Sequence, residues 1–299
     1  MRFEGIYTPI ITPFKDGGEI DWDIYAEVID WQIENGVAGI IVGGSTGEFY
    51  ALSKAERIQQ FKFAADRINN QVEFMAGVND IRVDECLEIS LAAVDAGAKS
   101  LLVAAPPYSL PSEEELASHV LDIANKTGLP IMLYNYPGRT GVEMGEIFLD
   151  IVADNPLIAA IKESSGDYSR LPLLSNNYSS IELAVGGEEQ VLEFTAWGAK
   201  SWVCATANFF PSECVQLMDI LGKQSDFEKG KRLMAAFMPL MKALEQGGKF
   251  LQCVKLGCEQ QGRPSGKVRL PLLPIEDSLR KEMIGVIDKT RSSLHSILN

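Results

Sequence analysis

The stretch IVGGSTGE, from Ile41 to Glu48, joins a β-branched run to a loop with three glycines and two hydroxyl side chains. Shortly after it, Ser53 and Glu56 have the spacing of a capping box, in which a hydroxyl and a carboxylate satisfy each other's amides at the start of a helix. The local order is therefore strand, glycine-rich loop and helix.

The same order recurs along the chain, and a second capping pair, Ser112 with Glu115, begins another helical segment. The apolar runs are GIYTPI (5–10), AGIIV (38–42), VEFMAG (72–77), SLLVAA (100–105), PIMLY (130–134), IAAIK (158–162), IELAV (181–185) and SWVCA (201–205). Eight strand–helix units in about 220 residues predict an α/β fold, a closed (β/α)8 TIM barrel, better than an open doubly wound sheet.

The remaining residues predict a helical extension. Residues 1–225 are expected to form the barrel domain, and residues 226–299 contain the helical segments FEKGKRLMAAFMPLMKALEQ (227–246) and IEDSLRKEMIGVIDKTRSSLHSIL (275–298). No linker rich in proline or serine separates the two parts.

Charge and composition narrow the class of partner. The net charge of −14 argues against nucleic acid and against an anionic membrane surface, so a small molecule is the expected partner. No run of about 18 apolar residues and no signal-peptide layout is present, which predicts a soluble cytoplasmic protein. The five cysteines are odd in number and lie in apolar segments, which indicates free buried thiols.

The glycine loop matches neither common nucleotide motif. Its glycines lack the G-x-G-x-x-G spacing, and Gly47 is followed by Glu48 rather than by lysine. Consecutive amides around Gly44 and the hydroxyls of Ser45 and Thr46 can nevertheless hold an anion such as a carboxylate. An ordinary glycine-rich turn is the alternative.

Two further stretches place reactive side chains at strand ends. In PIMLYNYPGRTG, Tyr134 ends the fifth run, and turn residues carry Arg139 over the barrel mouth, where it suits a carboxylate. In IAAIKESSGD, Lys162 ends an apolar run. A desolvated amine is more readily neutral, and the neutral amine forms Schiff bases with carbonyls. A solvated lysine is the alternative.

Together these residues predict a Schiff-base site. Tyr134 lies one strand from Lys162 and can move protons for imine formation, with Ser45 passing the proton onward. Tyr108, in the loop after the fourth run, could extend this relay. All of these residues lie at the carboxyl ends of strands, the face where barrel active sites occur.

Two other functional classes fit less well. A metal-dependent aldolase needs a cluster of ligands, but His119 falls inside an expected helix and His295 near the end of the sequence. A non-catalytic ligand sensor would be expected to have lost Lys162 or Tyr134. No metal or cofactor is therefore expected.

GGSTGE, the tyrosine of LYNYPGRTG and the lysine of AIKESSGD resemble, in order and spacing, the dihydrodipicolinate synthase and N-acetylneuraminate lyase superfamily. The resemblance extends to the GG of AVGGEE (186–187) and to the helical tail. It implies that Lys162 forms an imine with a 2-oxo acid and that Tyr134 donates and accepts protons. It also implies a homo-oligomer, a dimer or a tetramer, without metal or dissociable cofactor.

The resemblance assigns further roles. Ser45 and Tyr108 complete the proton relay, and Tyr108 reaches a neighbouring subunit's site in family dimers. Arg139 grips the carboxylate of a second substrate, as in synthases, and argues against the sugar-acid aldolases. The substrate-binding positions that the resemblance implies are Thr46, Gly44, Arg139, Gly186 and Ala205.

One branch of the superfamily is the expected match. YNYPGRTGVEMG, KESSGD, WGAKSWVCA and GGKFLQCVKLGCE resemble the 1-pyrroline-4-hydroxy-2-carboxylate deaminases of hydroxyproline breakdown. There Lys162 would exchange with the ring nitrogen, the 4-hydroxyl would leave, and hydrolysis would release ammonia and 2,5-dioxopentanoate. The alternatives are 4-hydroxy-tetrahydrodipicolinate synthase, which condenses pyruvate with aspartate semialdehyde, and a 2-oxo-acid aldolase or dehydratase.

Departures from the synthase pattern predict that L-lysine does not inhibit this protein. The segment AGVNDIRVDE and Phe49 replace residues that line the lysine pocket of regulated synthases, so the inhibitor should find no site. Turnover is expected to be unchanged when millimolar L-lysine is added to the assay. Clear inhibition by L-lysine would contradict this expectation.

Overall fold

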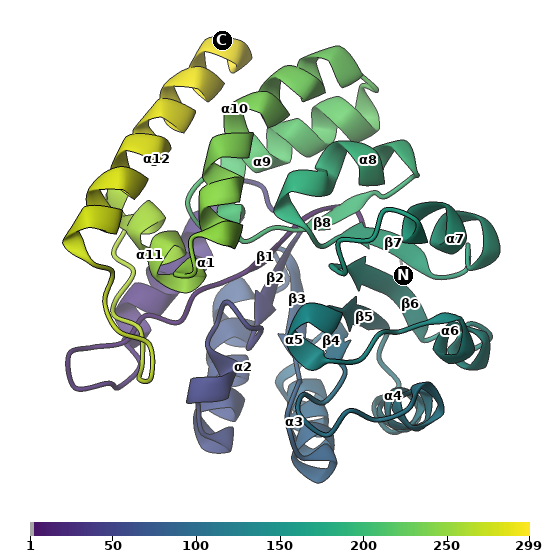
Figure 1. Cartoon of the computed structure of the whole chain (residues 1–299). Helices are drawn as coiled ribbons and strands as arrows, with labels where there is room; N and C mark the ends of the chain where they lie inside the picture. Colours follow the sequence, from purple (N-terminus) through teal and green to yellow (C-terminus); the bar gives the residue numbers. More distant parts are fainter. Residues whose placement is uncertain (1–2) are drawn as a thin grey trace.

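The computed structural model describes residues 3–299, and all eight of its strands are parallel and close into a barrel in the order β1 to β8 (Figure 1). The strands are β1 (Gly5–Pro9), β2 (Gly39–Val42), β3 (Glu73–Gly77), β4 (Ser100–Ala104), β5 (Ile131–Asn135), β6 (Ile158–Glu163), β7 (Glu182–Val185) and β8 (Ser201–Val203). Each lies within or overlaps one of the eight apolar runs, so the predicted (β/α)8 barrel is confirmed.

Helices surround the strands and follow them in sequence (Figure 1). The α-helices are α1 (Trp22–Glu34), α2 (Lys54–Ile68), α3 (Val83–Ala96), α4 (Glu113–Thr127), α5 (Pro137–Thr140), α6 (Glu146–Val152), α7 (Arg170–Asn177), α8 (Val191–Ala196), α9 (Pro211–Met218), α10 (Phe227–Gln246), α11 (Phe250–Gln260) and α12 (Asp277–Leu298). Four short helical segments complete the chain: η1 (Phe49–Ala51), η2 (Glu188–Gln190), η3 (Thr206–Asn208) and the π-helical η4 (Asp219–Lys223). Both predicted capping boxes are present, at the starts of α2 and α4.

Alternation along the strands divides the apolar residues into two cores. One core fills the barrel interior and includes Ile41, Met75, Leu102 and Met132. The other lies between the strands and the surrounding helices, where neighbours of these residues such as Val103 point outward. All five cysteines are buried and free, as expected. Among residues 3–299, no helix combines the length and apolar composition needed to cross a membrane.

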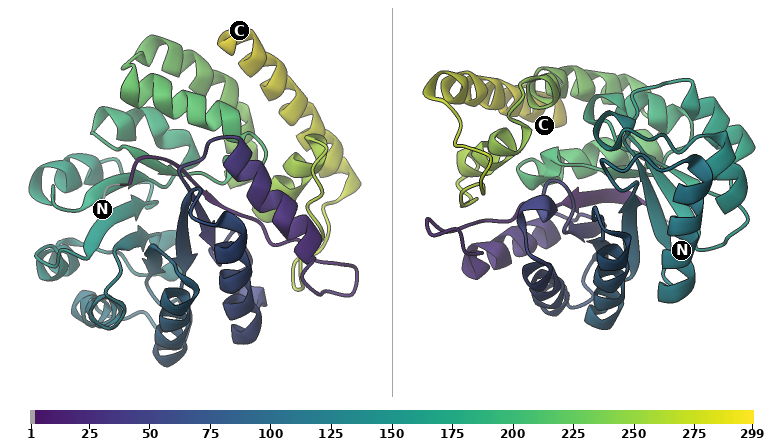
Figure 2. Two further views of the ribbon diagram at one scale, coloured as in Figure 1. Left: turned by 180° about the vertical axis from the view of Figure 1, so that it is seen from behind. Right: turned by 60° about the horizontal axis from the view of Figure 1, so that its bottom comes forward.

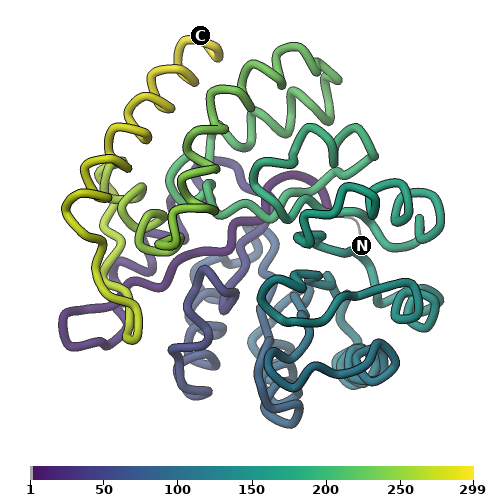
Figure 3. The backbone as a smooth tube through the Cα atoms, viewed as in Figure 1, coloured from purple at the N-terminus to yellow at the C-terminus, as the bar shows by residue number. Residues whose placement is uncertain are grey.

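The C-terminal helices lie together on one side of the barrel (Figure 3). Helices α10 and α12 pack against each other, and Figure 2 shows them on the same side of the barrel. Buried residues of these helices, including Phe237 and Ile287, belong to the same apolar cluster as the outer face of the barrel. The tail therefore packs continuously onto the barrel, and α10 begins close to the expected boundary at residue 226.

A buried ion pair joins the glycine loop to this tail. Nζ of Lys255, on α11, lies 2.9 Å from Oε1 of Glu48 and donates a hydrogen bond to the Thr12 carbonyl at 2.7 Å. Both side chains are almost fully buried. Oε2 of Glu48 accepts the amide of Arg269 at 2.9 Å. Glu48 has a φ of +58°, a left-handed conformation that a non-glycine residue adopts only where its surroundings hold it.

Removing the cation of this pair should destabilise the fold. Lys255→Met leaves the Glu48 carboxylate buried with the Arg269 amide as its remaining partner, and breaking such a pair costs about 3–5 kcal/mol in unfolding free energy. The double variant Glu48→Gln/Lys255→Met should be less destabilised than Lys255→Met, because it leaves no unpaired charge. Chemical denaturation of the purified variants measures both.

The matched control is Lys267→Met. Lys267 pairs with Asp16 at 2.7 Å, but both side chains are exposed, so its loss should cost at most about 1 kcal/mol. Equal destabilisation by Lys255→Met and Lys267→Met would contradict a special role for the buried pair.

Candidate active site

A cavity of about 250 Å³ opens at the carboxyl ends of the barrel strands. Its lining combines an apolar floor with hydroxyl, carboxylate and cationic side chains. The lining residues are Pro9, Ser45, Thr46, Tyr134, Tyr136, Arg139, Lys162, Ser164, Ser165, Gly166, Gly186, Gly187, Glu188, Glu189, Gln190, Val203, Ala205, Glu245 and Phe250. The structure thus brings together seven of the nine site residues expected from the sequence.

Lys162 and Tyr134 face each other across two neighbouring strands. The register of β5 and β6 pairs Tyr134 directly with Lys162, and Nζ of Lys162 lies 3.9 Å from the centroid of the tyrosine ring. The two residues are 7% and 8% exposed, respectively. Within residues 3–299, the Lys162 amine has no ion pair or hydrogen bond, so it is free to react with a ligand in the cavity.

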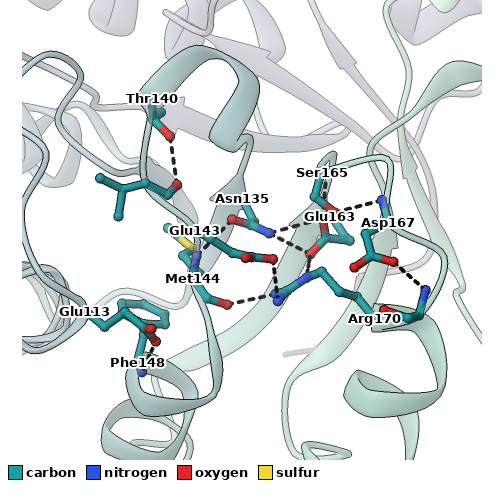
Figure 4. Close-up of polar contacts among 12 residues, drawn as sticks. Glu113, Asn135, Thr140, Glu143, Met144, Phe148, Glu163, Ser165, Asp167 and Arg170 are labelled. Carbon is teal, nitrogen blue, oxygen red and sulfur yellow. Dashed lines mark hydrogen bonds and ion pairs between the residues drawn. The ribbon is translucent and has the colours of Figure 1, made fainter.

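The next residue on each strand points to the opposite side of the sheet and holds these two in place (Figure 4). Glu163 accepts hydrogen bonds from Nδ2 of Asn135 at 2.9 and 3.1 Å and from Nε of Arg170 at 2.7 Å. It also accepts the Ser165 amide at 2.7 Å, and Oδ1 of Asn135 accepts the Met144 amide at 3.0 Å. This buried network ties the loop after β5 to the loop after β6, so Tyr134 and Lys162 sit on fixed strand ends.

The glycine loop presents free donors to the cavity. The amides of Gly47 and Glu48 are used inside the loop, on the carbonyls of Gly44 and Ser45, at 3.0 and 3.2 Å. The amides of Ser45 and Thr46 have no acceptor in the described part of the chain, and both residues line the cavity. The loop is therefore arranged to receive an anion.

Close approach of backbones makes glycine necessary at this end of the barrel. A Cβ atom on Gly77 would lie 2.6 Å from the Gly43 carbonyl oxygen, and one on Gly186 would lie 2.3 Å from that of Glu163. Gly186 therefore lets the strand ends come together where the cavity forms.

Arg139 lies on the short helix α5, which sits closer to the barrel centre than α4 and α6 (Figure 1). Its guanidinium carbon lies 5.3 Å from the centroid of the Tyr136 ring. Because the guanidinium is exposed at the cavity mouth, its donors remain available to a carboxylate.

Two expected site residues lie outside the cavity lining. Gly44 is buried and contributes its carbonyl to the turn of the glycine loop. Tyr108 is 92% exposed, has a left-handed φ of +76° and does not line the cavity of its own chain.

The sequence reasoning missed an acidic part of the lining. Glu188, Glu189 and Gln190 form η2, directly after the glycines that follow β7, and Glu245 comes from the last turn of α10. The position of Glu188 and Glu189 at a strand end was a usable signal. Nothing in the sequence indicated that Glu245 or Phe250 would reach the barrel mouth.

Desolvation raises the pKa of two of these carboxyls, that of the buried Glu188 and that of the more exposed Glu245. Desolvation raises the pKa of Glu188 to about 7, although the amides of Ala205 and Thr206 donate to it. Desolvation and then the charge of Glu189 raise the pKa of Glu245, while the charges of Arg139 and Lys162 lower it. Desolvation and the charge of Glu189 disfavour the charged form of Glu245.

Comparison with known proteins gives concordant matches along the chain. The model of the dihydrodipicolinate synthetase family matches residues 2–290. The 4-hydroxy-tetrahydrodipicolinate synthase of Methanocaldococcus jannaschii is 34% identical over 290 residues, covering 95% of this chain and 98% of the relative. The synthase of Leptospira biflexa is 30% identical over 285 residues, covering 94% and 95%. The solved structure of the synthase from Methylacidiphilum fumariolicum SolV matches with a TM-score of 0.93 at 28% identity, covering 99% and 98%.

The Glu188 carboxyl should make stability depend on pH. Its pKa in the folded protein, about 7, lies above its ordinary value of 4.5, so its contribution is full below pH 4.5 and is lost as the pH rises through 7. The loss corresponds to roughly 3 kcal/mol. As the pH rises from 4.5 through 7, the wild type should therefore lose unfolding free energy relative to Glu188→Gln.

Denaturant titrations at several pH values measure this difference, and Glu193→Gln serves as the control because Glu193 is exposed on α8. A difference between wild type and Glu188→Gln that does not change with pH would refute the expected ionisation of Glu188.

Proposed function

This chain belongs to the dihydrodipicolinate synthetase family of Schiff-base lysine lyases, and we propose that it condenses pyruvate with aspartate semialdehyde through an imine on Lys162. The observation that carries the proposal is the unpaired, largely buried Lys162 amine facing Tyr134 in a cavity with donors for carboxylates. The named relatives support this reaction better than the deaminase expected from the sequence.

The first half of the proposed reaction uses Lys162 and Tyr134. The neutral amine of Lys162 attacks C2 of pyruvate, and the resulting carbinolamine loses water to form the imine. Tyr134 donates and accepts the protons of this step, with Ser45 as the next member of the relay. The imine withdraws electrons, so the methyl group loses a proton and becomes an enamine.

The second half forms the carbon–carbon bond. The enamine carbon attacks the aldehyde carbon of the semialdehyde, and the aldehyde oxygen takes up a proton. The deprotonated amino group of the same substrate then attacks the imine carbon, displaces Lys162 and closes the ring. One water is lost overall, so the product is 4-hydroxy-tetrahydrodipicolinate.

The donors around the cavity suit the two carboxylates of these substrates. The amides and hydroxyls of Ser45 and Thr46 would hold the carboxylate of pyruvate, and Arg139 would hold that of the second substrate. Gly186 and Ala205 shape the wall beside them, and Gly44 supports the loop from behind.

We assign Tyr108 a role in a second copy of this chain. Tyr108 is 92% exposed and does not line the cavity of its own subunit, which fits a side chain that completes a neighbour's relay in a dimer or tetramer. A homo-oligomer in the cytoplasm is therefore part of the proposal.

The 1-pyrroline-4-hydroxy-2-carboxylate deaminase remains the second candidate function. The observation that favours it is the resemblance of YNYPGRTGVEMG, KESSGD, WGAKSWVCA and GGKFLQCVKLGCE to that branch. Both candidate functions use the imine on Lys162, so substrate turnover has to distinguish them.

The deciding experiment offers both substrates to the purified protein. Pyruvate with aspartate semialdehyde is followed by a coupled reductase assay, and ammonia release is followed from 1-pyrroline-4-hydroxy-2-carboxylate. Lys162→Ala is the blank for both, and pyruvate with borohydride should add mass to the wild type alone. Ammonia release without synthase turnover would replace the proposed reaction with the deaminase, and turnover by Lys162→Ala would overturn the lysine mechanism.

Replacing Tyr134 with phenylalanine should slow turnover by about 10²- to 10⁴-fold, the range for loss of a general acid or base. Because Lys162 remains, borohydride trapping of the imine should decrease less than turnover. Steady-state rates and intact-protein mass spectra measure the two effects. Equal losses in both would show that Tyr134 positions Lys162 rather than transferring protons.

A further inference from the structure

We propose that Glu189, Glu245 and Gln190 form a subsite for the ammonium group of the second substrate. This inference rests on the proposed synthase function and specifies how that site selects an amino aldehyde. Glu189 and Gln190 belong to η2 at the end of β7, whereas Glu245 belongs to the C-terminal helix α10. All three side chains line the cavity that holds Lys162.

The charges in the cavity do not match the first substrate alone. Two cationic residues, Lys162 and Arg139, share the lining with three glutamates. Pyruvate carries a carboxylate and no cation, so it gives the glutamates no favourable partner. The second substrate of the proposed reaction carries a carboxylate and an ammonium group, which together fit a lining of mixed charge.

Two of the three glutamates make no side-chain hydrogen bond or ion pair among the described residues. Glu188 accepts hydrogen bonds from the amides of Ala205 and Thr206. Glu189 and Glu245, by contrast, have no side-chain hydrogen bond and no ion pair within residues 3–299, and Oε2 of Glu189 is buried. A buried carboxylate oxygen without a partner, as on Glu189, is costly, and a cation supplied by a ligand would offset that cost. Glu245 is exposed at the cavity mouth, so its carboxylate is open to a ligand that enters the cavity.

Gln190 supplies independent evidence for a ligand. It is 5% exposed and lines the cavity, yet its side-chain amide makes no hydrogen bond in the described part of the chain. Buried amides normally have partners. Its oxygen lies next to Gly187 in the same cavity lining and is therefore available as an acceptor for a ligand there.

The number of acceptors favours a primary ammonium group. An ammonium on carbon has three N–H donors, and the subsite offers one acceptor group on each of Glu189, Glu245 and Gln190. The protonated ring nitrogen of a pyrroline has one N–H donor and would leave two of these groups unpaired. The subsite therefore fits the amino aldehyde better than a cyclic imine.

The test removes the carboxylate and the ammonium separately. Wild type, Glu245→Gln and Glu189→Gln are assayed with pyruvate and either aspartate semialdehyde or succinic semialdehyde, which lacks the amino group. Glu193→Gln is the matched control, because its carboxylate is exposed on α8 outside the cavity lining. If a variant or the wild type does not condense succinic semialdehyde, the constant that is compared is the inhibition constant of succinic semialdehyde against aspartate semialdehyde instead of its KM.

Glu245→Gln and Glu189→Gln should each raise KM for aspartate semialdehyde by about tenfold or more, the effect of losing one close charge partner. The constants for succinic semialdehyde and pyruvate should change less than about twofold, since these compounds bring no cation to the subsite. Borohydride trapping with pyruvate should remain at the wild-type level, which also shows that the variants are folded. Glu193→Gln should behave as wild type.

Two other outcomes would distinguish a failure of the ammonium subsite from a failure of the proposed synthase function. Equal weakening of aspartate semialdehyde and succinic semialdehyde by the glutamate variants would overturn the ammonium subsite while leaving the synthase function intact. Absence of wild-type turnover with either aldehyde, together with intact pyruvate trapping, would overturn the synthase function and with it this assignment.

Discussion

The register between β5 and β6 is the constraint on which the site depends. It pairs Tyr134 with Lys162 and, one residue further, Asn135 with Glu163. Because side chains alternate across a strand, the first pair faces the barrel interior and the second faces the surrounding helices. The buried network of Glu163, Asn135 and Arg170 then ties the following loops together. A slip of one residue would exchange the reactive pair for the supporting pair, so catalysis and stability depend on the same register.

The glycine loop depends on a second, more distant constraint. Among residues 3–299 its amides at Ser45 and Thr46 have no acceptor, whereas the next two amides close the turn. Lys255 holds Glu48, the last residue of this loop. Lys255 lies on α11, so the tail that follows the barrel fixes the shape of a loop near its start. Burying this ion pair removes water from both charged groups, which costs free energy. The same desolvation lowers the pKa of Lys255. In exchange, the ion pair stabilises a loop conformation that is left-handed at Glu48 and that the loop sequence alone would not hold.

The charges that line the cavity differ from the overall charge of this strongly acidic protein. The net charge of −14 is spread over the whole chain, but the cavity concentrates Lys162, Arg139 and free loop amides where carboxylates would bind. In the same cavity Glu189 and Glu245 have no partner among the described residues 3–299, and this mixture suits a ligand with both signs of charge. Family membership identifies the class of chemistry, that of the Schiff-base lysine lyases, whereas the proposed roles of Lys162 and of the other charged residues rest on how the cavity arranges them.

The sequence by itself determined the strands, the helix caps, the buried cysteines and the principal site residues at strand ends, because these follow from local periodicity and chain order. Lys162, Tyr134, Ser45, Thr46 and Arg139 were found since parallel strands bring their carboxyl ends to one face. Tertiary structure alone decided that Glu245 and Phe250 reach the cavity, that Lys255 pairs with Glu48, and that Tyr108 stays outside the cavity of its own chain. These contacts join segments far apart in the chain, and their geometry depends on how α10 and α11 pack against the barrel. The local sequence of a helix does not predict which element the helix packs against, because its apolar face can be buried against many different neighbours.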